Sequence, residues 1–212
     1  MKPKEILIDP DAVDADGLAE AQAVAGAGEL TLNGALIVGG TFTGDYARRL
    51  GILSAGDDSG DTFTIVGTDA DGKAQTEDLA GDNGAPGTAE SVKYYKTVTS
   101  VSTDGAAAGN VSVGTVDEFV TNTIPIENNN HDAATVSIEL ITGTIDISIE
   151  ETFSRIQYDD ILKWFAGPTA LTTITADAAD DVDNHASGVR LVCNSYTSGA
   201  ELRMIINQNR SW

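Results

Sequence analysis

Short segments in which aliphatic and polar side chains alternate are the feature that most limits what this chain can fold into. The clearest is GTIDISIE (residues 143–150), in which isoleucines alternate with Asp146, Ser148 and Glu150. This period of two places the isoleucines on one face of a β-strand and the polar side chains on the other. TFTIV and AELRMIIN repeat the pattern, and turn residues interrupt the chain roughly every 10 to 15 residues. An all-β fold is therefore predicted, built as β-sandwich or barrel-like lobes.

Differences in pattern divide the 212 residues into an N-terminal arm (1–29), a first β lobe (30–116) and a second β lobe (117–212). The arm mixes acids, alanines and glycines, which predicts an extended or partly ordered segment packed on another surface, or else a frayed terminus. Hydrophobic residues make up 41% of the chain and aromatic residues only 6%. The core is therefore expected to consist mainly of Val, Ile, Leu and Ala.

One short α-helix is predicted near residues 155–166. Ser154 and Gln157 have the spacing of a capping box, and a Gly-Pro pair ends the periodic segment. The apolar face of this helix would consist of Tyr158, Ile161, Leu162 and Phe165. The alternative is that SRIQYDD continues the preceding strand.

Three other segments predict local geometry. In TFTIVGTDADGKAQTEDL, Asp69 and Asp71 take positions 3 and 5 of a calcium-binding EF-hand loop when Gly72 is position 6. Position 1 is then Gly67, which has no side-chain ligand, and the flanks are strands, so a β-hairpin is the favoured interpretation. In SVKYYKTVTSVS the apolar positions change phase once, which predicts a β-bulge. VRLVCN and AELRMIIN are expected to form a hairpin in which Gly199 adopts a positive φ.

Acidic residues outnumber basic ones by 33 to 12, giving a formal net charge of −21. The excess is spread evenly, with 18 acids and 7 bases before Val116 and 15 acids and 5 bases from Val116 onward. Such a field repels phosphate, which argues against binding nucleic acid or an anionic membrane and favours multivalent cations or a partner with a basic patch. The start MKPKEILIDPD has no long apolar segment, and no apolar run approaches the length of a membrane span. Folding in a cytoplasm is therefore expected.

Two acidic clusters are the candidates for metal binding. One is SAGDDSGD (54–61), and the other is DAADDVDNH (177–185), which offers more carboxylates. The candidate ligands of a weakly bound Ca²⁺ are Asp180, Asp181 and Asp183. Solvated turns are the other interpretation of both clusters.

Catalytic residues and an organic cofactor are not indicated. His131 and His185 lie in polar loops that lack the sequence context of a nucleophile. The single cysteine, Cys193, lies in the apolar run VRLVCN, as expected for a buried structural thiol without an internal disulfide. Zinc-ligand spacing and phosphate-binding glycine motifs are also missing from the sequence. The chain is therefore predicted not to be an enzyme.

Three stretches resemble a broad group of tailed-bacteriophage virion proteins. They are SAGDDSGDTFTIVGTDADGK, YYKTVTSVSTDGAAAGNVSVGT and GVRLVCNSYTSGAELRMIINQ, and together they cover about a third of the chain. Each is a β-hairpin pattern rich in Gly, Thr and Ser. The resemblance implies a structural component of the virion that carries no catalytic residues, folds in the host cytoplasm and is assembled in many copies.

Among virion roles, the even acidity favours a capsid decoration (cement) protein on the head exterior, away from packaged DNA. Such a protein is expected to bridge major capsid subunits as a homo-oligomer, a trimer or a dimer. A neck or tail adaptor, or a fibre-associated protein, is the alternative. A carbohydrate-binding β-sandwich module is a third interpretation, with Trp164, Tyr196 and Trp212 as candidate aromatic contacts.

Overall fold

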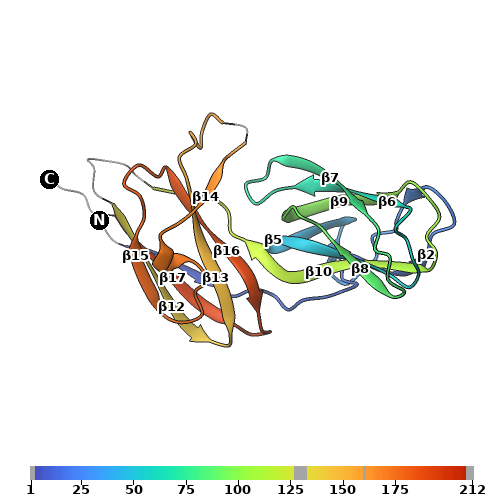
Figure 1. Cartoon of the computed structure of the whole chain (residues 1–212), viewed down its shortest axis with the longest axis horizontal. Coiled ribbons are helices and arrows are strands. Elements are labelled where there is room, and N and C mark those ends of the chain that lie inside the picture. Colours follow the sequence, from blue (N-terminus) through green and yellow to red (C-terminus); the bar gives the residue numbers. More distant parts are fainter. Residues whose placement is uncertain (1–2, 127–132, 160, 209–212) are drawn as a thin grey trace. The chain divides into compact units, whose positions relative to one another are not determined.

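The computed structural model describes residues 3–126, 133–159 and 161–208, and their regular structure is almost entirely β-strand (Figure 1). The predicted all-β class is therefore confirmed. Among the described residues the strands form open sheets, so the barrel-like form of the prediction is not found.

Two compact units make up the chain. The terminal unit comprises Met1–Ala12 and Val120–Trp212, and the central unit comprises Val13–Phe119. The prediction of a separate N-terminal arm is corrected, because β1 (Lys4–Ile8) belongs to the terminal unit and β2 (Ala19–Ala23) to the central unit. The arm is extended, as expected, but it supplies strands to both units. Its strand partners lie far along the sequence, where a local pattern cannot identify them.

The central unit is built on five strands in the order β10-β5-β9-β6-β7. Shorter strands extend this sheet: β2 pairs with β10, β3 with β9, and both β4 and β8 pair with β5. The other strands of the central unit are β3 (Gly28–Glu29), β4 (Ile37–Val38), β5 (Thr41–Ser54), β6 (Thr62–Thr68), β7 (Ala74–Ala80), β8 (Gly87–Glu90), β9 (Tyr95–Thr103) and β10 (Asn110–Val120). Phe42, Phe63 and Tyr95 are buried together with aliphatic side chains in one core cluster.

The hairpin predicted at DADG is confirmed. Strands β6 and β7 pair in antiparallel register from Thr62↔Ala80 to Thr68↔Ala74. The Asp69 carboxylate accepts hydrogen bonds from the backbone N–H groups of Asp71 (3.0 Å) and Lys73 (2.9 Å), and Gly72 has a φ of +80°. The aspartate therefore stabilises its own turn, which is a common use of this residue type.

The bulge predicted in the following strand is also confirmed. Val66 lies opposite Ser100, but its neighbour Gly67 lies opposite Val98, so Thr99 is the extra residue in β9. The bulge lets Val98 and Val101 both face the core although they are three residues apart.

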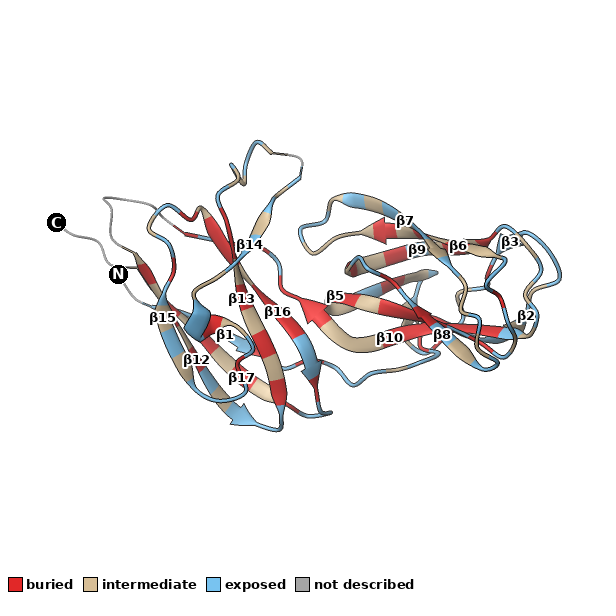
Figure 2. Cartoon of the chain, viewed as in Figure 1, coloured by how far each residue is buried: buried red, intermediate tan, exposed pale blue. Residues whose placement is uncertain are grey.

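The terminal unit consists of two sheets. One has the order β1-β17-β12-β15, and the other has the order β14-β13-β16 with β11 paired to β16. The other strands of the terminal unit are β11 (Ile124–Pro125), β12 (Ala134–Thr142), β13 (Ile145–Thr152), β14 (Trp164–Ala166), β15 (Ala178–Asp181), β16 (Gly188–Tyr196) and β17 (Glu201–Gln208). The alternating isoleucines of β13 are buried, and so are Leu202, Met204 and Ile206 of β17 (Figure 2). The result is an aliphatic, β-sandwich-like core.

The predicted hairpin between VRLVCN and AELRMIIN is wrong, because β16 and β17 belong to different sheets. β16 pairs with β13, and β17 pairs with β12 and β1. The connecting segment is therefore an arch between two sheets, and Gly199 in it has the predicted positive φ, +75°. A second arch joins β12 to β13, and the backbone N–H of Thr197 donates to the carbonyl of Thr144 (2.9 Å), which links the two arches.

The predicted α-helix near residues 155–166 is also wrong. Strand β13 ends at Thr152, a single turn follows in which Tyr158 N–H donates to Arg155 O (2.8 Å), and the chain then forms β14. Ser154 Oγ accepts a hydrogen bond from Lys163 N–H (3.0 Å), so it closes a loop and does not cap a helix. The alternative, in which SRIQYDD continues the strand, is not found either. The one helical element described is a 3-10 turn, η1 (Thr169–Leu171).

Candidate functional site

The three candidate calcium ligands lie on β15 and in the turn that follows it, but they do not converge. Asp180 accepts a hydrogen bond from Asp181 N–H (2.9 Å), Asp181 from the Thr135 hydroxyl (2.6 Å), and Asp183 from His185 N–H (2.7 Å). Asp180 and Asp181 are consecutive in a strand, so their side chains point to opposite faces. Across the described ranges, no three Asp, Glu, His or Cys side chains are grouped so that they could hold a metal ion. These carboxylates therefore act in the structure as local hydrogen-bond acceptors.

The first acidic cluster has a structural role. Asp58 is buried, and its Oδ1 accepts a hydrogen bond from Ala108 N–H (2.5 Å), which ties the loop before β6 to the loop before β10. Its Oδ2 is buried without a hydrogen-bond partner within the part of the chain that the structure describes. Asp57 instead accepts hydrogen bonds from the backbone and hydroxyl of Ser59, which lower the pKa of Asp57 below its ordinary value.

The other candidate residues are placed as follows. Cys193 is buried in β16, as predicted for a structural thiol. The His185 imidazole is exposed and lies 3.1 Å from Asp183 Oδ1. His131 lies outside the described residues. The polar neighbour of His185 is therefore Asp183, and Cys193 is buried separately in β16.

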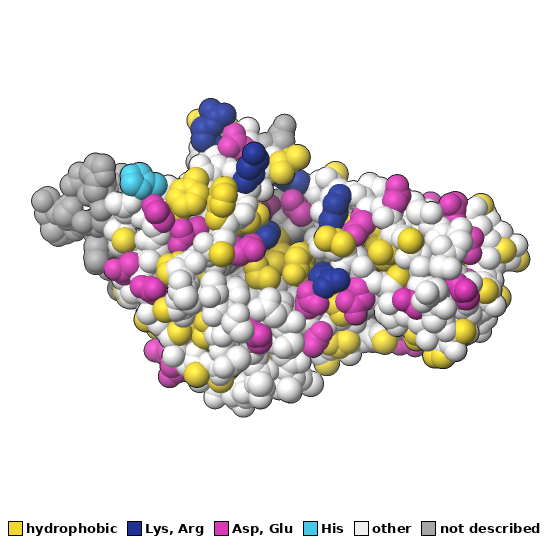
Figure 3. All heavy atoms as spheres, viewed as in Figure 1, with side chains coloured by type: hydrophobic (Ala, Val, Ile, Leu, Met, Phe, Trp, Pro, Cys, Tyr) yellow, Lys and Arg dark blue, Asp and Glu magenta, His cyan; other side chains and the backbone are white. Residues whose placement is uncertain are grey.

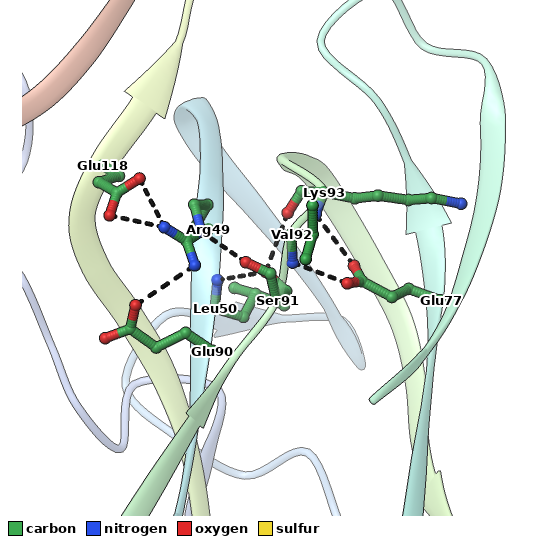
Figure 4. Close-up of polar contacts among 8 residues, drawn as sticks. All are labelled: Arg49, Leu50, Glu77, Glu90, Ser91, Val92, Lys93 and Glu118. Carbon is green, nitrogen blue, oxygen red and sulfur yellow. Dashed lines mark hydrogen bonds and ion pairs between the residues drawn. The ribbon is translucent and has the colours of Figure 1, made fainter. Parts of the chain in front are cut away.

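A network of charged and polar groups in the central unit holds one loop in place (Figure 4). Arg49 of β5 contacts both carboxylate oxygens of Glu118 through its Nη1 (2.6 and 2.7 Å), and its Nη2 lies 3.3 Å from Glu90. Burial alone would lower the pKa of Arg49, but the hydrogen bond and charge of Glu118 and the charge of Glu90 raise it above its ordinary value. The guanidinium also donates to the carbonyl of Ser91, so the ion pairs position the start of the loop 91–94.

The rest of this loop is held from β7. Glu77 accepts hydrogen bonds from the backbone N–H groups of Val92 (2.7 Å) and Lys93 (3.1 Å), while the buried Ser91 hydroxyl accepts from Leu50 N–H (2.9 Å). The buried Tyr95 hydroxyl lies near the same glutamate, and burial together with the charge of Glu77 raises the pKa of Tyr95. The network orders a loop whose exposed apolar residue is Val92, at 77% exposure.

A larger exposed apolar surface lies in the terminal unit. We call residues 153–165, between the ends of β13 and β14, the aromatic loop. Its exposed large side chains are Phe153 (44% exposed), Tyr158 (76%), Ile161 (83%) and Phe165 (52%). In the described chain, every large aromatic side chain that is exposed belongs to this loop. Figure 1 shows the loop extending away from the strands of the terminal unit, and in Figure 3 apolar and basic side chains gather on this projection.

Both ends of the aromatic loop are fixed to the sheet. Phe153 and Phe165 pack edge to face with ring centroids 5.6 Å apart. The Ser187 hydroxyl donates to the carbonyls of Thr152 (2.9 Å) and Ser154 (2.6 Å). These contacts fix Phe153 and Phe165 at the two ends of the loop, which reduces the entropy that these side chains lose when a partner binds.

Basic side chains accompany the aromatic ones. Arg155 pairs with Asp159 (3.1 Å), and Arg190 of β16 stacks on the Trp164 ring at 4.3 Å while pairing with Glu150 (2.6 Å). Among the described residues of the terminal unit, the basic side chains are Lys4, Arg155, Lys163, Arg190 and Arg203. Three of these five therefore lie in or directly beside the aromatic loop, in a protein whose formal net charge is −21.

A pocket of about 300 Å³ lies at the base of the aromatic loop. Ile126 and Ile156 give it apolar walls, and Arg155 and Tyr158 stand at the loop side. The remaining lining residues are Pro125, Gln157 and Ser187. An aliphatic side chain from another molecule would find apolar surroundings here, with charged and aromatic groups beside them.

The aromatic residues named from sequence are not the exposed ones. The Trp164 ring is covered by Arg190, Tyr196 is buried, and Trp212 lies outside the described residues. The helical spacing predicts a buried position for Tyr158 and Phe165, whereas both are exposed in the structure. A signal that could have indicated the loop is the Asp159-Asp160 pair at the centre of that helix, because aspartate favours caps and turns over helix interiors.

No protein-family model, curated protein or solved structure matches this chain. Among the described residues, no helix has the length and apolar character needed to cross a bilayer.

Proposed function

We propose that this chain is a non-enzymatic structural protein of a tailed-phage virion, and that it acts by protein contact. The observation that carries the contact function is the aromatic loop, whose described residues include four exposed large apolar side chains. Aromatic residues and arginine are the side chains that protein interfaces favour, and clustered exposed apolar groups mark contact sites. The virion setting rests on the three Gly/Thr/Ser-rich stretches that resemble phage virion proteins.

Within the virion, the proposed role is that of a decoration protein on the head exterior that bridges major capsid subunits. The net charge of −21 supports an exterior position, because packaged DNA repels such a chain and a basic patch on a capsid subunit attracts it. The same charge would draw the whole molecule toward a basic partner from a distance, and the apolar side chains of the aromatic loop would supply the affinity.

Particles that lack this protein provide the test. Purified wild-type chain is added back, and resistance to heat, chelator and osmotic shock is measured. We expect bare particles to be fragile, wild-type chain to restore resistance, and Ile161→Asp to restore it poorly. Val38→Asp is the matched control, because Val38 of β4 is as exposed as Ile161 (82% and 83%) but lies in the central unit. Bare particles as resistant as complete ones would refute the decoration role.

Copy number separates decoration from the alternative, a neck or tail adaptor or a fibre-associated protein. Mass spectrometry of intact particles, calibrated on the major capsid protein, should find hundreds of copies of this protein per particle. A dozen copies or fewer would support the alternative.

One observation keeps the carbohydrate-binding module as a second candidate: Tyr158 is 76% exposed and stands beside the pocket at the base of the loop. Exposed aromatic rings can stack on sugar rings through their apolar faces. A glycan array would test this candidate. Binding to a defined glycan that is lost in Tyr158→Ala would favour the module, and an empty array would exclude it for the glycans present.

A further inference from the structure

We infer that three loops at one end of the central unit bind a calcium ion, with a buried carboxylate oxygen of Asp58 as the central ligand. The loops are residues 55–61, 81–86 and 104–109, which follow β5, β7 and β9. We call them the three-loop junction. The site lies within the central unit, so the inference does not depend on the aromatic loop or on the capsid role proposed above.

Backbone contacts join the three loops around Asp58. The Asp58 N–H donates to the carbonyl of Asp82 (3.0 Å), and the Asp58 Oδ1 accepts from Ala108 N–H (2.5 Å). The Gly81 N–H donates to the carbonyl of Asp61 (3.0 Å). Asp58 is therefore enclosed by the other two loops, and only 1% of the residue is exposed.

The second carboxylate oxygen of Asp58 has no protein group to compensate it. Oδ2 is buried and accepts no hydrogen bond from any group in the described chain. Since Oδ1 of the same carboxylate contacts Ala108, Oδ2 also lies inside the three-loop junction. Burying a carboxylate oxygen without a partner is costly, and buried charges in proteins are paired or bind metal ions. This oxygen is thus a ligand position in search of a cation.

The protein does not supply that positive charge itself. The three-loop junction contains five aspartates and no Lys, Arg or His. Across residues 3–126, 133–159 and 161–208, none of these aspartates forms an ion pair with a basic side chain. The five basic residues of the central unit lie on β5, in the β6–β7 turn and around the start of β9, and they are Arg48, Arg49, Lys73, Lys93 and Lys96. A bound cation is therefore the remaining source of compensation.

Backbone carbonyl oxygens and water complete the site. No three acidic side chains are grouped for metal binding in the described ranges, so carboxylates alone do not form it. Glycines bring the loop backbone close to the aspartates. A Cβ at Gly105 would overlap Asp61 Oδ1, and a Cβ at Gly81 would overlap the Asp58 carbonyl oxygen. The carbonyl groups of these loops therefore lie where they can act as ligands.

This set of ligands favours calcium over magnesium. Ca²⁺ accepts carboxylate and backbone carbonyl oxygens in a flexible geometry, whereas Mg²⁺ demands a near-ideal octahedron and loses its water reluctantly. A cation reaches the buried Asp58 Oδ2 only after it sheds water on that side. With so few carboxylates the affinity is low, and we expect a dissociation constant of about 10⁻⁴ to 10⁻³ M.

Calcium titration of the chelator-treated full chain tests this inference. Isothermal titration calorimetry should detect one site per chain in that affinity range. About 10 mM CaCl₂ should raise the melting temperature by about 3 °C or more, because the ion binds the folded state. MgCl₂ at the same ionic strength should have a much smaller effect on the melting temperature.

Two variants locate the binding site. Asp58→Asn keeps an oxygen for the Ala108 N–H but removes the negative charge, so it should abolish both the heat and the rise in melting temperature. Asp180→Asn removes the same charge from the acidic cluster of the terminal unit and should retain both. Amide NMR spectra of the wild type provide a measurement that needs no variant: calcium should shift the Ala108 and Gly81 signals.

Three results would overturn the inference: a wild type without a calcium site, an equal response in Asp58→Asn, or loss of binding in Asp180→Asn. If Asp58→Asn does not fold, the NMR spectra decide, and calcium-induced shifts that spare the three-loop junction would refute the site. Failure here is distinguishable from failure of the proposed function. A chain that binds no calcium but restores particle resistance through Ile161 would leave the capsid role intact.

Discussion

The central unit keeps its large aromatic side chains inside, whereas the terminal unit places most of its own at the surface. Phe42, Phe63 and Tyr95 are buried in the core of the central unit. In the terminal unit the core is aliphatic, and Phe153 and Phe165 are exposed together with Tyr158 (Figure 2). These rings thus lie outside the buried core of the terminal unit, and their grouping at the surface indicates a contact role.

The exposed loops of the two units differ in the same way. The loop 91–94 is held by side chains from two strands, Arg49 of β5 and Glu77 of β7, and exposes a single apolar side chain, Val92. The aromatic loop is fixed at its ends and exposes four. Exposure of one apolar residue is common on any protein surface, but a group of them indicates a contact surface.

The largest expected effect is on the core of the central unit. Phe63→Ala should lower the free energy of unfolding by about 3–5 kcal/mol, because it removes a completely buried ring and leaves a cavity. Phe165→Ala removes the same atoms from a half-exposed site and should cost far less. Denaturant titration followed by circular dichroism compares the two variants. Equal losses would show that the aromatic loop is part of a folding core.

A smaller loss is expected from the network that holds the loop 91–94. Ser91→Ala removes the hydroxyl that accepts the buried Leu50 N–H, and should cost about 1–3 kcal/mol. Hydrogen exchange of the Leu50 amide should accelerate in parallel. Ser59→Ala, at an exposed hydroxyl that contacts Asp57, serves as the control and should change stability by less than about 0.5 kcal/mol. If Ser91→Ala were as mild as this control, the network would not order the loop.

A pH-dependent effect is expected in the terminal unit at the buried Glu151, which lies opposite Phe165 in the sheet. Burial, together with the charge of Asp183, raises the pKa of Glu151, although the hydrogen bond from Asp183 N–H opposes the shift. A raised folded-state pKa means that this group stabilises the fold below its ordinary range and that this contribution is lost as pH rises through the folded pKa. Glu151→Gln should therefore be more stable than wild type at neutral pH, and the difference should shrink as the wild-type carboxyl becomes protonated.

Melting temperatures measured from neutral pH down to the ordinary glutamate range would follow that difference. Glu201→Gln, on the half-exposed face of β17, controls for the loss of one negative charge. A Glu151→Gln advantage that stayed constant with pH would contradict the assigned burial effect.

The smallest effect on stability is expected at the aromatic loop itself. Tyr158→Ala should change the free energy of unfolding by less than about 0.5 kcal/mol, because the ring is 76% exposed. The same variant should restore particle resistance less well than wild type in the add-back experiment. A variant that lost stability but still restored resistance fully would reverse the assignment of this side chain to contact.

Local periodicity predicted which side chains face the core but not which strands are neighbours. The isoleucines of β13 and the Leu202, Met204 and Ile206 set of β17 are buried as predicted. The arch between β16 and β17 was mistaken for a hairpin, because either connection needs a turn with a positive-φ glycine such as Gly199. The pairing of Lys4 with Ile206 joins positions at opposite ends of the chain, and no local pattern contains it.

The aromatic loop could not be predicted from the sequence for a related reason: its conformation depends on contacts between distant residues. Tyr158, Ile161 and Phe165 have helical spacing, so the sequence favoured a helix with these residues buried. In the structure Ser154 accepts a hydrogen bond from Lys163, and the same side chains are exposed. The choice depends on tertiary contacts such as those of Ser187, which lies far along the sequence.

The central claim is that the aromatic loop is the surface through which this protein meets its partner. Hydroxyl-radical footprinting, read out by mass spectrometry, measures this directly on the free chain and on the assembled form. We predict that Phe153, Tyr158, Ile161 and Phe165 are labelled in the free chain and protected on assembly, while Val38 and Val92 of the central unit stay labelled in both. Unchanged labelling of the loop, with protection appearing at Val38 or Val92 instead, would contradict the account.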